Sequence, residues 1–137
     1  MMKDRQSVLV VEDEILIRLA LVDLLEDEGF QVYEASNVLE AVAILGQAEA
    51  IDAVITDVDM PGALNGFDLM RLVASCYSQS LVIVTSGAHR PSASELAEGC
   101  HFVEKPYRSQ TLLDLLDRHI EGSCEGGKRN FNERLRA

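Results

Sequence analysis

The residue best placed to do chemistry is Asp57, because it ends a short apolar run and a turn follows it at once. Residues 53–57 read Ala-Val-Ile-Thr-Asp, and Pro61 and Gly62 come shortly afterwards. An apolar run of this length, bounded by turn residues, is typical of a strand buried on both faces of a parallel sheet. In such sheets ligands bind beyond the carboxyl ends of the strands. We therefore expect Asp57 to lie at the edge of the fold where ligands bind.

Further polar residues stand at the ends of other apolar runs. They are Glu12 and Asp13 after 7–11, Thr85 at the end of 81–85, and Lys105 within 102–106. Two carboxylates ~4 Å apart repel each other by about 4 kcal/mol at an effective dielectric of about 20. Such a cluster either keeps protons or binds a hard cation, for which Mg²⁺ is the natural candidate. Carboxylates, an ammonium and a hydroxyl together indicate a phosphoryl site rather than a hydrolytic triad.

The elements that must position these residues alternate along the chain. Strands are expected at 7–11, 30–35, 53–57, 81–85 and 102–106, and helices after Glu14, after Asn37, over 67–74, at 94–98 and from near Ser109. The helix at 94–98 is expected to be short or irregular. Alternation of five strands with five helices predicts an α/β fold, a (βα)5 flavodoxin-like three-layer sandwich around a parallel five-stranded sheet. The strand order 2-1-3-4-5 is expected, because its switch point lies between strands one and three, where the acids fall.

Composition sets limits on location and partners. The chain has 137 residues and a formal net charge of −11, which argues against direct binding of nucleic acid. No apolar run is long enough for a membrane span, and the first residues do not form a signal peptide, so a cytoplasmic protein is expected. Residues 1–121 are expected to form one domain, and the basic segment 122–137 a flexible tail with no output domain after it. His89, His101 and His119 show no paired spacing and are interpreted as surface or helix-face residues.

Taken together, Glu12-Asp13, Asp57, Thr85 and Lys105-Pro106 resemble the receiver domain of bacterial two-component response regulators. The resemblance covers about residues 7 to 121, and the joint pattern is far more specific than any single motif. Such a protein accepts a phosphoryl group from a sensor histidine kinase or a histidine phosphotransfer protein. It then signals to a downstream protein by a change of conformation, with a phosphorylation-dependent homodimer as a further option. The resemblance implies no separate enzyme activity beyond self-catalysed acceptance and slow autodephosphorylation.

The resemblance also implies a role for each matching residue. Asp13, Asp57 and the backbone carbonyl of Asp59 would bind Mg²⁺, with Glu12 acting mainly through water. Asp57 would be the phosphoacceptor and form an acyl phosphate, and Lys105 would pair with Asp57 and then with the phosphoryl oxygens. As the switch residues, Thr85 would turn toward the phosphoryl group and Phe102 would move inward, and the Lys105-Pro106 peptide bond would be cis. The side chain of Asp59 would either position or repel a water that attacks the acyl phosphate.

The chain departs from the family pattern in three places. The loop from Met60 to Gly66 is one residue longer than the commonest version. Phe102 lacks the hydroxyl of the frequent Tyr, so its movement would affect packing only. The short fourth helix puts the usual output and dimer geometry in doubt, because that helix ordinarily belongs to the output surface.

An enzyme is the main alternative from another class. Asp57-Val58-Asp59 after an apolar strand also resembles the nucleophile motif of haloacid-dehalogenase-like phosphohydrolases, in which Asp59 would be the general acid/base. That motif normally lies on the first strand, and it would leave Glu12 and Asp13 unexplained. A receiver without phosphorylation would have lost one of the site residues, and none is lost. A flavin-binding domain is disfavoured because the acids after the first strand would repel a phosphate.

Overall fold

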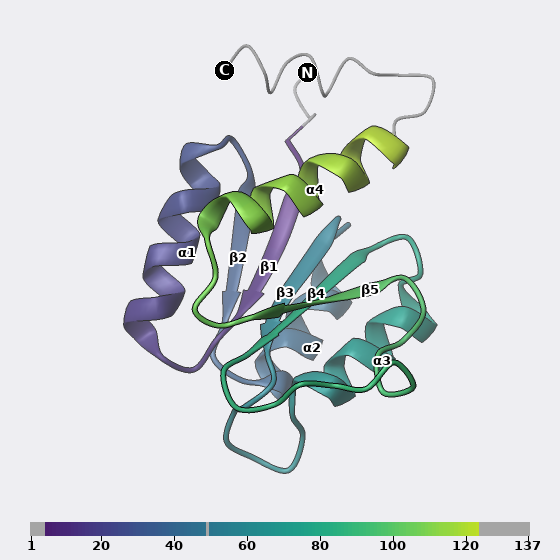
Figure 1. The fold of residues 1–137 in the computed structure, drawn as a ribbon. Coiled ribbons are helices and arrows are strands. Elements are labelled where there is room, and N and C mark those ends of the chain that lie inside the picture. The colour runs from purple at the N-terminus through teal and green to yellow at the C-terminus, as the bar shows by residue number, and fades with distance from the viewer. Residues whose placement is uncertain (1–4, 49, 124–137) are drawn as a thin grey trace.

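The computed structural model describes residues 5–48 and 50–123, with side chains described as far as Ile120. Its strands are β1 (Ser7–Val11), β2 (Gln31–Ala35), β3 (Ala53–Asp57), β4 (Leu81–Ser86) and β5 (Cys100–Glu104). They form a single parallel sheet in the order β2-β1-β3-β4-β5 (Figure 1), which confirms the predicted order. Every residue of β1, β3 and β4 is buried, as expected for central strands with helices on both faces. The edge strands β2 and β5 are partly exposed.

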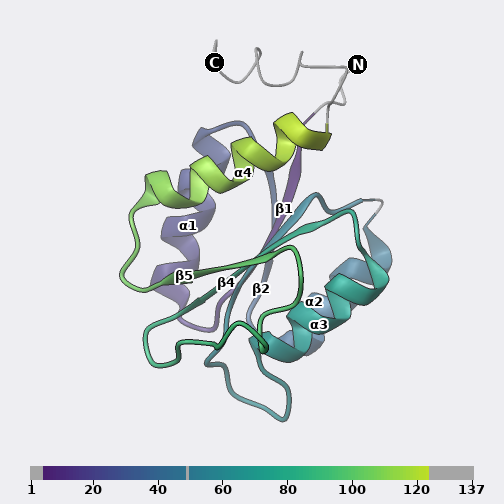
Figure 2. The same cartoon turned by 45° about the vertical axis from the view of Figure 1, so that its right-hand side comes forward.

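The helices form the two outer layers. They are α1 (Ile15–Asp27), α2 (Val38–Gln47), α3 (Gly66–Cys76) and α4 (Ser109–Ser123). Helices α1 and α4 cover one face of the sheet, and α2 and α3 cover the other (Figures 1 and 2). Because side chains alternate along a strand, neighbouring strand residues enter different cores. Leu9 packs on the α2/α3 side, for example, whereas Val10 packs on the α1/α4 side.

The expected fourth of five helices is absent. Between β4 and β5 the described chain forms bends and turns, so the expectation of even a short helix at 94–98 was wrong. The segment is rich in Ser, Gly and Pro, which favour turns over helix. The side chain of Glu95 accepts a hydrogen bond from the backbone N–H of Ser92 (2.8 Å), and the N–H of Glu95 returns one to the Ser92 carbonyl (3.0 Å). Leu96 and Ala97 still pack against the α2/α3 core, so the segment covers part of that face without a helix.

Several predicted boundaries shift. Strand β5 begins at Cys100 and ends at Glu104, so Lys105 and Pro106 follow the strand instead of closing it. Helix α4 reaches Ser123, slightly into the segment interpreted as a tail, and the rest of that tail lies outside the described residues.

The membrane expectation can be compared only with the described helices. None of the helices in the described ranges has the length and apolar character needed to span a membrane.

Helix α1 carries apolar side chains at helical spacing but buries only some of them. Val22 and Leu25 are buried, but Ile15 and Leu19 are exposed, and Leu16 is 78% exposed. The amino-terminal half of α1 therefore presents apolar side chains to solvent. Such a face is a feature of surfaces that bind partners.

Candidate functional site

Alternation along the strands brings the predicted site residues to one side of the sheet. Val10, Ile55, Ile83 and Val103 all pack in the α1/α4 core. Two residues further along each strand stand Glu12, Asp57, Thr85 and Lys105. Residues two apart point to the same face of a strand, so these four positions share the α1/α4 side at the carboxyl edge. Asp57 and Thr85 are also direct register partners between β3 and β4.

Three carboxylates meet at this edge. Glu12 and Asp57 are only 4% and 5% exposed, whereas Asp13 is open to solvent. One oxygen from each of Glu12, Asp13 and Asp57 can be chosen so that all three atoms lie within 4.8 Å of one another. The site therefore combines two buried acids with an accessible third.

Lys105 provides the positive charge beside the acids. Its Nζ donates a hydrogen bond to Glu12 Oε1 (3.1 Å) and lies 3.3 Å from Asp57 Oδ1 in an ion pair. The second contact lacks hydrogen-bond geometry: Asp57 Oδ1 is fully buried and has no hydrogen-bond partner among the described residues. Buried polar atoms are rarely left in this state. Asp57 thus keeps an oxygen available for a ligand.

The positive charge of Lys105 does not fully offset the effect of burial on the two buried carboxylates. Burial raises the pKa of Asp57 despite the opposing charge of Lys105, and the charge of Asp59 raises this pKa further. Burial likewise raises the pKa of Glu12, more than its hydrogen bond with Lys105 lowers it. For Lys105, burial lowers the pKa, but the hydrogen bond with Glu12 and the charge of Asp57 outweigh it, so the pKa is raised. One ammonium thus leaves both buried carboxylates harder to ionise than in water.

These residues fit a hard divalent cation. A carboxylate cluster with a free buried oxygen and a solvent-facing acid suits Mg²⁺, which prefers oxygen ligands and keeps several waters. The candidate ligands are Asp13 and Asp57, with Glu12 close behind and the backbone carbonyl of Asp59 nearby in sequence. A bound dication would also oppose the effect of burial, which raises the two carboxyl pKa values.

The remaining predicted residues lie next to this cluster. Thr85 is 3% exposed, beside Asp57 in the sheet. Phe102 is half-buried on β5 and packs against the α2/α3 core, on the opposite side of the sheet from the acid cluster. The Lys105-Pro106 peptide bond is cis, as the resemblance implies.

Comparison with known proteins now identifies the family. The sequence model of the response regulator receiver domain matches residues 8–117. The chain belongs to this family. The response regulator FleR of Pseudomonas aeruginosa is 32% identical over 89% of this chain and 26% of its own length. The transcriptional regulatory protein PdtaR of Mycobacterium tuberculosis is 30% identical over 95% of this chain and 66% of its own.

Solved structures show the same fold. A response regulator receiver domain protein from Clostridium thermocellum matches with a TM-score of 0.78 and 30% identity, over 86% of this chain and 96% of that chain. A receiver protein from Sinorhizobium medicae matches with a TM-score of 0.79 and 25% identity, over the same shares. The chain spans only about a quarter of the length of FleR and of the NtrX-like regulators of Rickettsia. The likeness therefore concerns the receiver domain of those proteins.

Within this receiver domain, Gly66 allows the start of α3 to pack tightly against the backbone of Asp57 and Val58. A Cβ at Gly66 would collide with the carbonyl oxygen of Asp57 and come within 2.8 Å of Val58 Cα. Immediately before it, Asn65 caps α3 by accepting hydrogen bonds from the N–H groups of Phe67 and Asp68, and Asp68 completes the capping box. Helix α3 therefore begins directly against the backbone of Asp57.

Arg18 is a site-supporting residue that the sequence analysis missed. Its Nη1 donates a hydrogen bond to the backbone carbonyl of Glu12 (2.8 Å), and its Nε donates one to Glu34 Oε1 (3.1 Å). The backbone N–H of Glu14 donates to Glu12 Oε2 (3.2 Å). Arg18 thus links the turn that carries Glu12 and Asp13 to β2. Its position one turn into the helix that follows these acids was the available signal.

A second missed group surrounds the side chain of Asp59. The hydroxyl of Ser86 donates a hydrogen bond to Asp59 Oδ2 (2.8 Å), and His89 Nδ1 lies 2.8 Å from Asp59 Oδ1 in an ion-pair contact. His89 is exposed, as predicted for a surface histidine, and it also contacts the side chain of Asp59. No local spacing predicts this contact, because it joins segments that follow different strands.

Proposed function

We propose that this chain acts as a two-component receiver in which Asp57 takes a phosphoryl group from a phosphohistidine. The observation that carries the proposal is the state of Asp57: it is buried at the carboxyl end of β3, lies 3.3 Å from Lys105, and keeps a buried oxygen without a hydrogen-bond partner among the described residues. The unpartnered oxygen can serve as a ligand of the cation, which leaves the second carboxylate oxygen of Asp57 for nucleophilic attack, with Lys105 beside the carboxylate. The family assignment supports this role over that of a phosphohydrolase.

Each residue of the site has a separate role in phosphoryl transfer. An Asp57 oxygen attacks phosphorus while the phosphorus–nitrogen bond of the donor breaks, and the electron pair leaves with the imidazole. Lys105 stabilises the charge on the transferred group, since its Nζ already lies at the acceptor. Asp13 and Glu12, with Asp57, would hold Mg²⁺, which when bound neutralises charge on the carboxylates and phosphoryl oxygens. Thr85, beside Asp57 in the sheet, supplies a hydroxyl for a phosphoryl oxygen.

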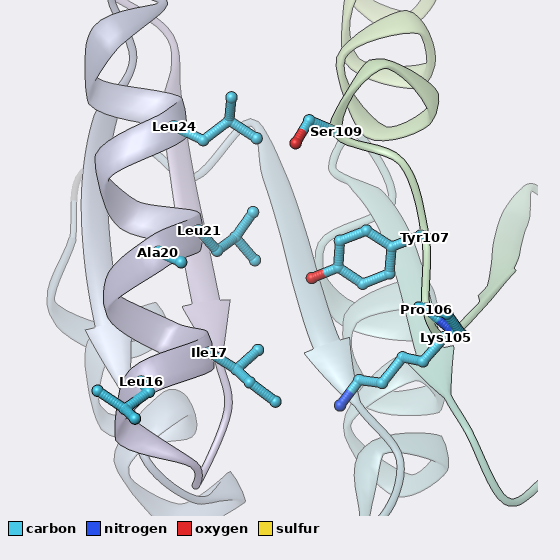
Figure 3. A pocket seen from close by; sticks show the side chains of 9 residues that line it. All are labelled: Leu16, Ile17, Ala20, Leu21, Leu24, Lys105, Pro106, Tyr107 and Ser109. Carbon is cyan, nitrogen blue, oxygen red and sulfur yellow. The ribbon is translucent and has the colours of Figure 1, made fainter.

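The donor would reach this site over α1. A groove of ≈ 620 Å³ separates α1 from the segment that joins β5 to α4, and its lining includes Ile17, Leu21, Tyr107 and Lys105 (Figure 3). Lys105 belongs both to the groove and to the acid cluster, so the groove leads to the acceptor. Leu16 also lines this groove, and Leu16 and Leu19 expose apolar side chains on the same helix. We assign this face to the histidine-bearing helix of a sensor kinase or phosphotransfer protein, because helices bind apolar grooves through apolar stripes.

Phosphorylation would then be read by a downstream protein through changed contacts. The added group brings about −1.5 to −2 charges to a site that already holds more acid than base. Thr85 and Phe102 lie on β4 and β5, the strands nearest to the helix-free segment, and are the residues through which the change would spread. A cytoplasmic location and a homodimer in the phosphorylated state remain part of this proposal, and no substrate other than the phosphodonor is expected.

The test is phosphorylation by a small-molecule donor. The protein is incubated with acetyl phosphate, with and without Mg²⁺, and its intact mass is measured. A gain of ~80 Da that requires Mg²⁺ and is absent in Asp57→Asn supports the proposal. Absence of the adduct, with no stabilisation by Mg²⁺, contradicts it. Rapid multiple turnover of unrelated phosphomonoesters would instead favour a phosphohydrolase.

A further inference from the structure

We propose that His89 and Ser86 hold the carboxylate of Asp59 in the position from which it orients the water that hydrolyses the acyl phosphate on Asp57. The inference rests on the proposed function, because it concerns how long the phosphoryl group survives. His89 and Ser86 are positioning residues in this account, since both act through Asp59.

The contacts fix both oxygens of the Asp59 carboxylate. Ser86 Oγ donates a hydrogen bond to Oδ2, and His89 Nδ1 lies against Oδ1, each at 2.8 Å. A carboxylate with only one contact can rotate about its terminal bond, whereas contacts to both oxygens restrict that rotation. The Asp59 side chain is therefore held at both ends while 39% of it stays exposed to solvent.

The residues that hold Asp59 are themselves fixed. Ser86 is fully buried, and its Oγ accepts hydrogen bonds from the backbone N–H groups of Ala88 (3.1 Å) and His89 (2.9 Å). These bonds fold the first residues after β4 around the Ser86 hydroxyl. The imidazole of His89 also packs edge-on against the ring of Phe67, with centroids 6.4 Å apart and planes at 82°. His89 is thus restrained by its backbone, by Phe67 and by Asp59.

The held carboxylate stands close to the reaction. Asp59 follows Asp57 by two residues, and its charge contributes to the raised pKa of Asp57, so the two side chains interact electrostatically. The Asp59 side chain is also 39% exposed, so water reaches this carboxylate only two residues from the buried Asp57.

Hydrolysis needs a well-placed water more than it needs a strong base. The water oxygen bonds to phosphorus as the bond between phosphorus and the Asp57 oxygen breaks, and the electron pair returns to the Asp57 carboxylate. Inorganic phosphate leaves, and the surplus proton passes to solvent. Each carboxylate oxygen has a second acceptor site, so Asp59 can bind a water hydrogen while Ser86 and His89 remain in place. Fixing the acceptor lowers the entropy lost when the water is oriented. The sequence left repulsion and positioning equally open, and the double anchoring favours positioning.

The experiment compares three variants at His89. His89→Ala removes the ring, His89→Phe keeps a ring against Phe67 but removes the nitrogen, and His89→Asn keeps an N–H near the place of Nδ1. Each protein is phosphorylated with acetyl phosphate and Mg²⁺, freed of donor, and followed by the loss of ~80 Da with time. We expect His89→Ala and His89→Phe to lose the phosphoryl group about three- to tenfold more slowly than the parent, and His89→Asn to stay close to it.

An Asp59→Ala background shows whether His89 acts through Asp59. There, His89→Ala should slow hydrolysis no further, because the carboxylate that it positions is gone. Unfolding by urea without Mg²⁺ measures the same coupling by a route that does not involve phosphate: the loss of stability caused by His89→Ala should shrink when Asp59 is already Ala.

The outcomes separate this inference from the proposed function. Unchanged or faster hydrolysis in both His89→Ala and His89→Phe, or equal slowing in the Asp59→Ala background, overturns the positioning role while a phosphorylated parent upholds the proposed function. A parent that takes up no phosphoryl group overturns both. If His89→Ala does not fold, the comparison of His89→Phe with His89→Asn decides by itself.

Discussion

At the scale of single residues, burial in the receiver site disfavours the charged form of two carboxyl groups. Glu12 and Asp57 lie at the carboxyl edge of a sheet whose central strands are buried, and Lys105 is the cation that contacts both. Burial raises the pKa of both carboxyl groups in spite of Lys105. The site is therefore arranged to favour a ligand that brings further positive charge, and not to stabilise the empty fold.

The pH dependence of stability follows from this balance. A carboxyl group whose pKa is raised by folding contributes stability at low pH, and this contribution is lost as the pH rises through the folded-state pKa. Without Mg²⁺, Asp57→Asn should therefore be more stable than the parent near neutral pH, by on the order of 1 kcal/mol for each unit of pKa shift. The difference should shrink as the pH falls toward about 4.

Urea unfolding at several pH values measures this difference. Asp23→Asn, at an exposed position of α1, is the matched control and should follow the parent at every pH. An Asp57→Asn protein that is less stable than the parent at neutral pH would contradict the assigned effect of burial.

Asp13 offers the clearest test of the metal site. It is exposed, so Asp13→Asn should fold like the parent in the absence of metal, yet it removes one of the three clustered carboxylates. A ligand at a hundredfold excess over its dissociation constant stabilises a protein by about 2.7 kcal/mol. Mg²⁺ should therefore raise the unfolding free energy of the parent and raise that of Asp13→Asn much less. Glu14→Gln changes the exposed acid next to it and serves as the control, which should respond like the parent.

At the scale of the elements, the close contact between the start of α3 and the backbone of Asp57 and Val58 requires a glycine at position 66. Gly66→Ala should destabilise the protein by several kcal/mol, because the new Cβ meets backbone atoms of Asp57 and Val58 that cannot move aside. Gly46→Ala is the control: a Cβ there meets nothing within 4 Å, and Ala is favoured over Gly inside a helix by roughly 0.5–1 kcal/mol. Thermal unfolding of the two variants should shift in opposite directions, and a neutral Gly66→Ala would show that the loop is looser than described.

Helix α1 carries the prediction for the partner. Leu16 lines the groove and is 78% exposed, so Leu16→Asp should slow phosphoryl transfer from a histidine phosphotransfer protein by at least about tenfold. Transfer from acetyl phosphate should be unchanged, because the acid cluster is not altered. Leu39→Asp places the same change on the equally exposed Leu39 of α2, which lies on the other face of the sheet. If Leu39→Asp slows protein-mediated transfer as much as Leu16→Asp does, the donor does not bind at α1.

At the scale of the whole molecule, the parts of the fold that could be predicted are those set by local pattern. Buried strands appear as continuous apolar runs, and the acids at the ends of the first and third runs pointed to the strand order. The helix at 94–98 was predicted wrongly because regular alternation of strand and helix suggested it, whereas its Ser, Gly and Pro content favoured turns.

The parts of the site that escaped prediction are those that depend on tertiary contacts. Ser86 and Asp59 are 27 residues apart and meet only because β3 and β4 are neighbours. The exposed apolar side of α1 also resembled a core stripe, because periodicity alone does not distinguish a buried face from a binding face. The main acid cluster was predictable because its members stand at the carboxyl ends of β1 and β3.

The central claim is that Asp57 is the residue that becomes phosphorylated. The most direct measurement is to treat the protein with phosphoramidate and Mg²⁺, whose phosphorus–nitrogen bond matches that of a phosphohistidine, and to reduce the product with borohydride. Reduction converts a phosphorylated aspartate to homoserine, which peptide mass spectrometry places in the sequence. The account predicts homoserine at position 57, dependent on Mg²⁺. Homoserine at position 59 or 13, or none at any position, would contradict it.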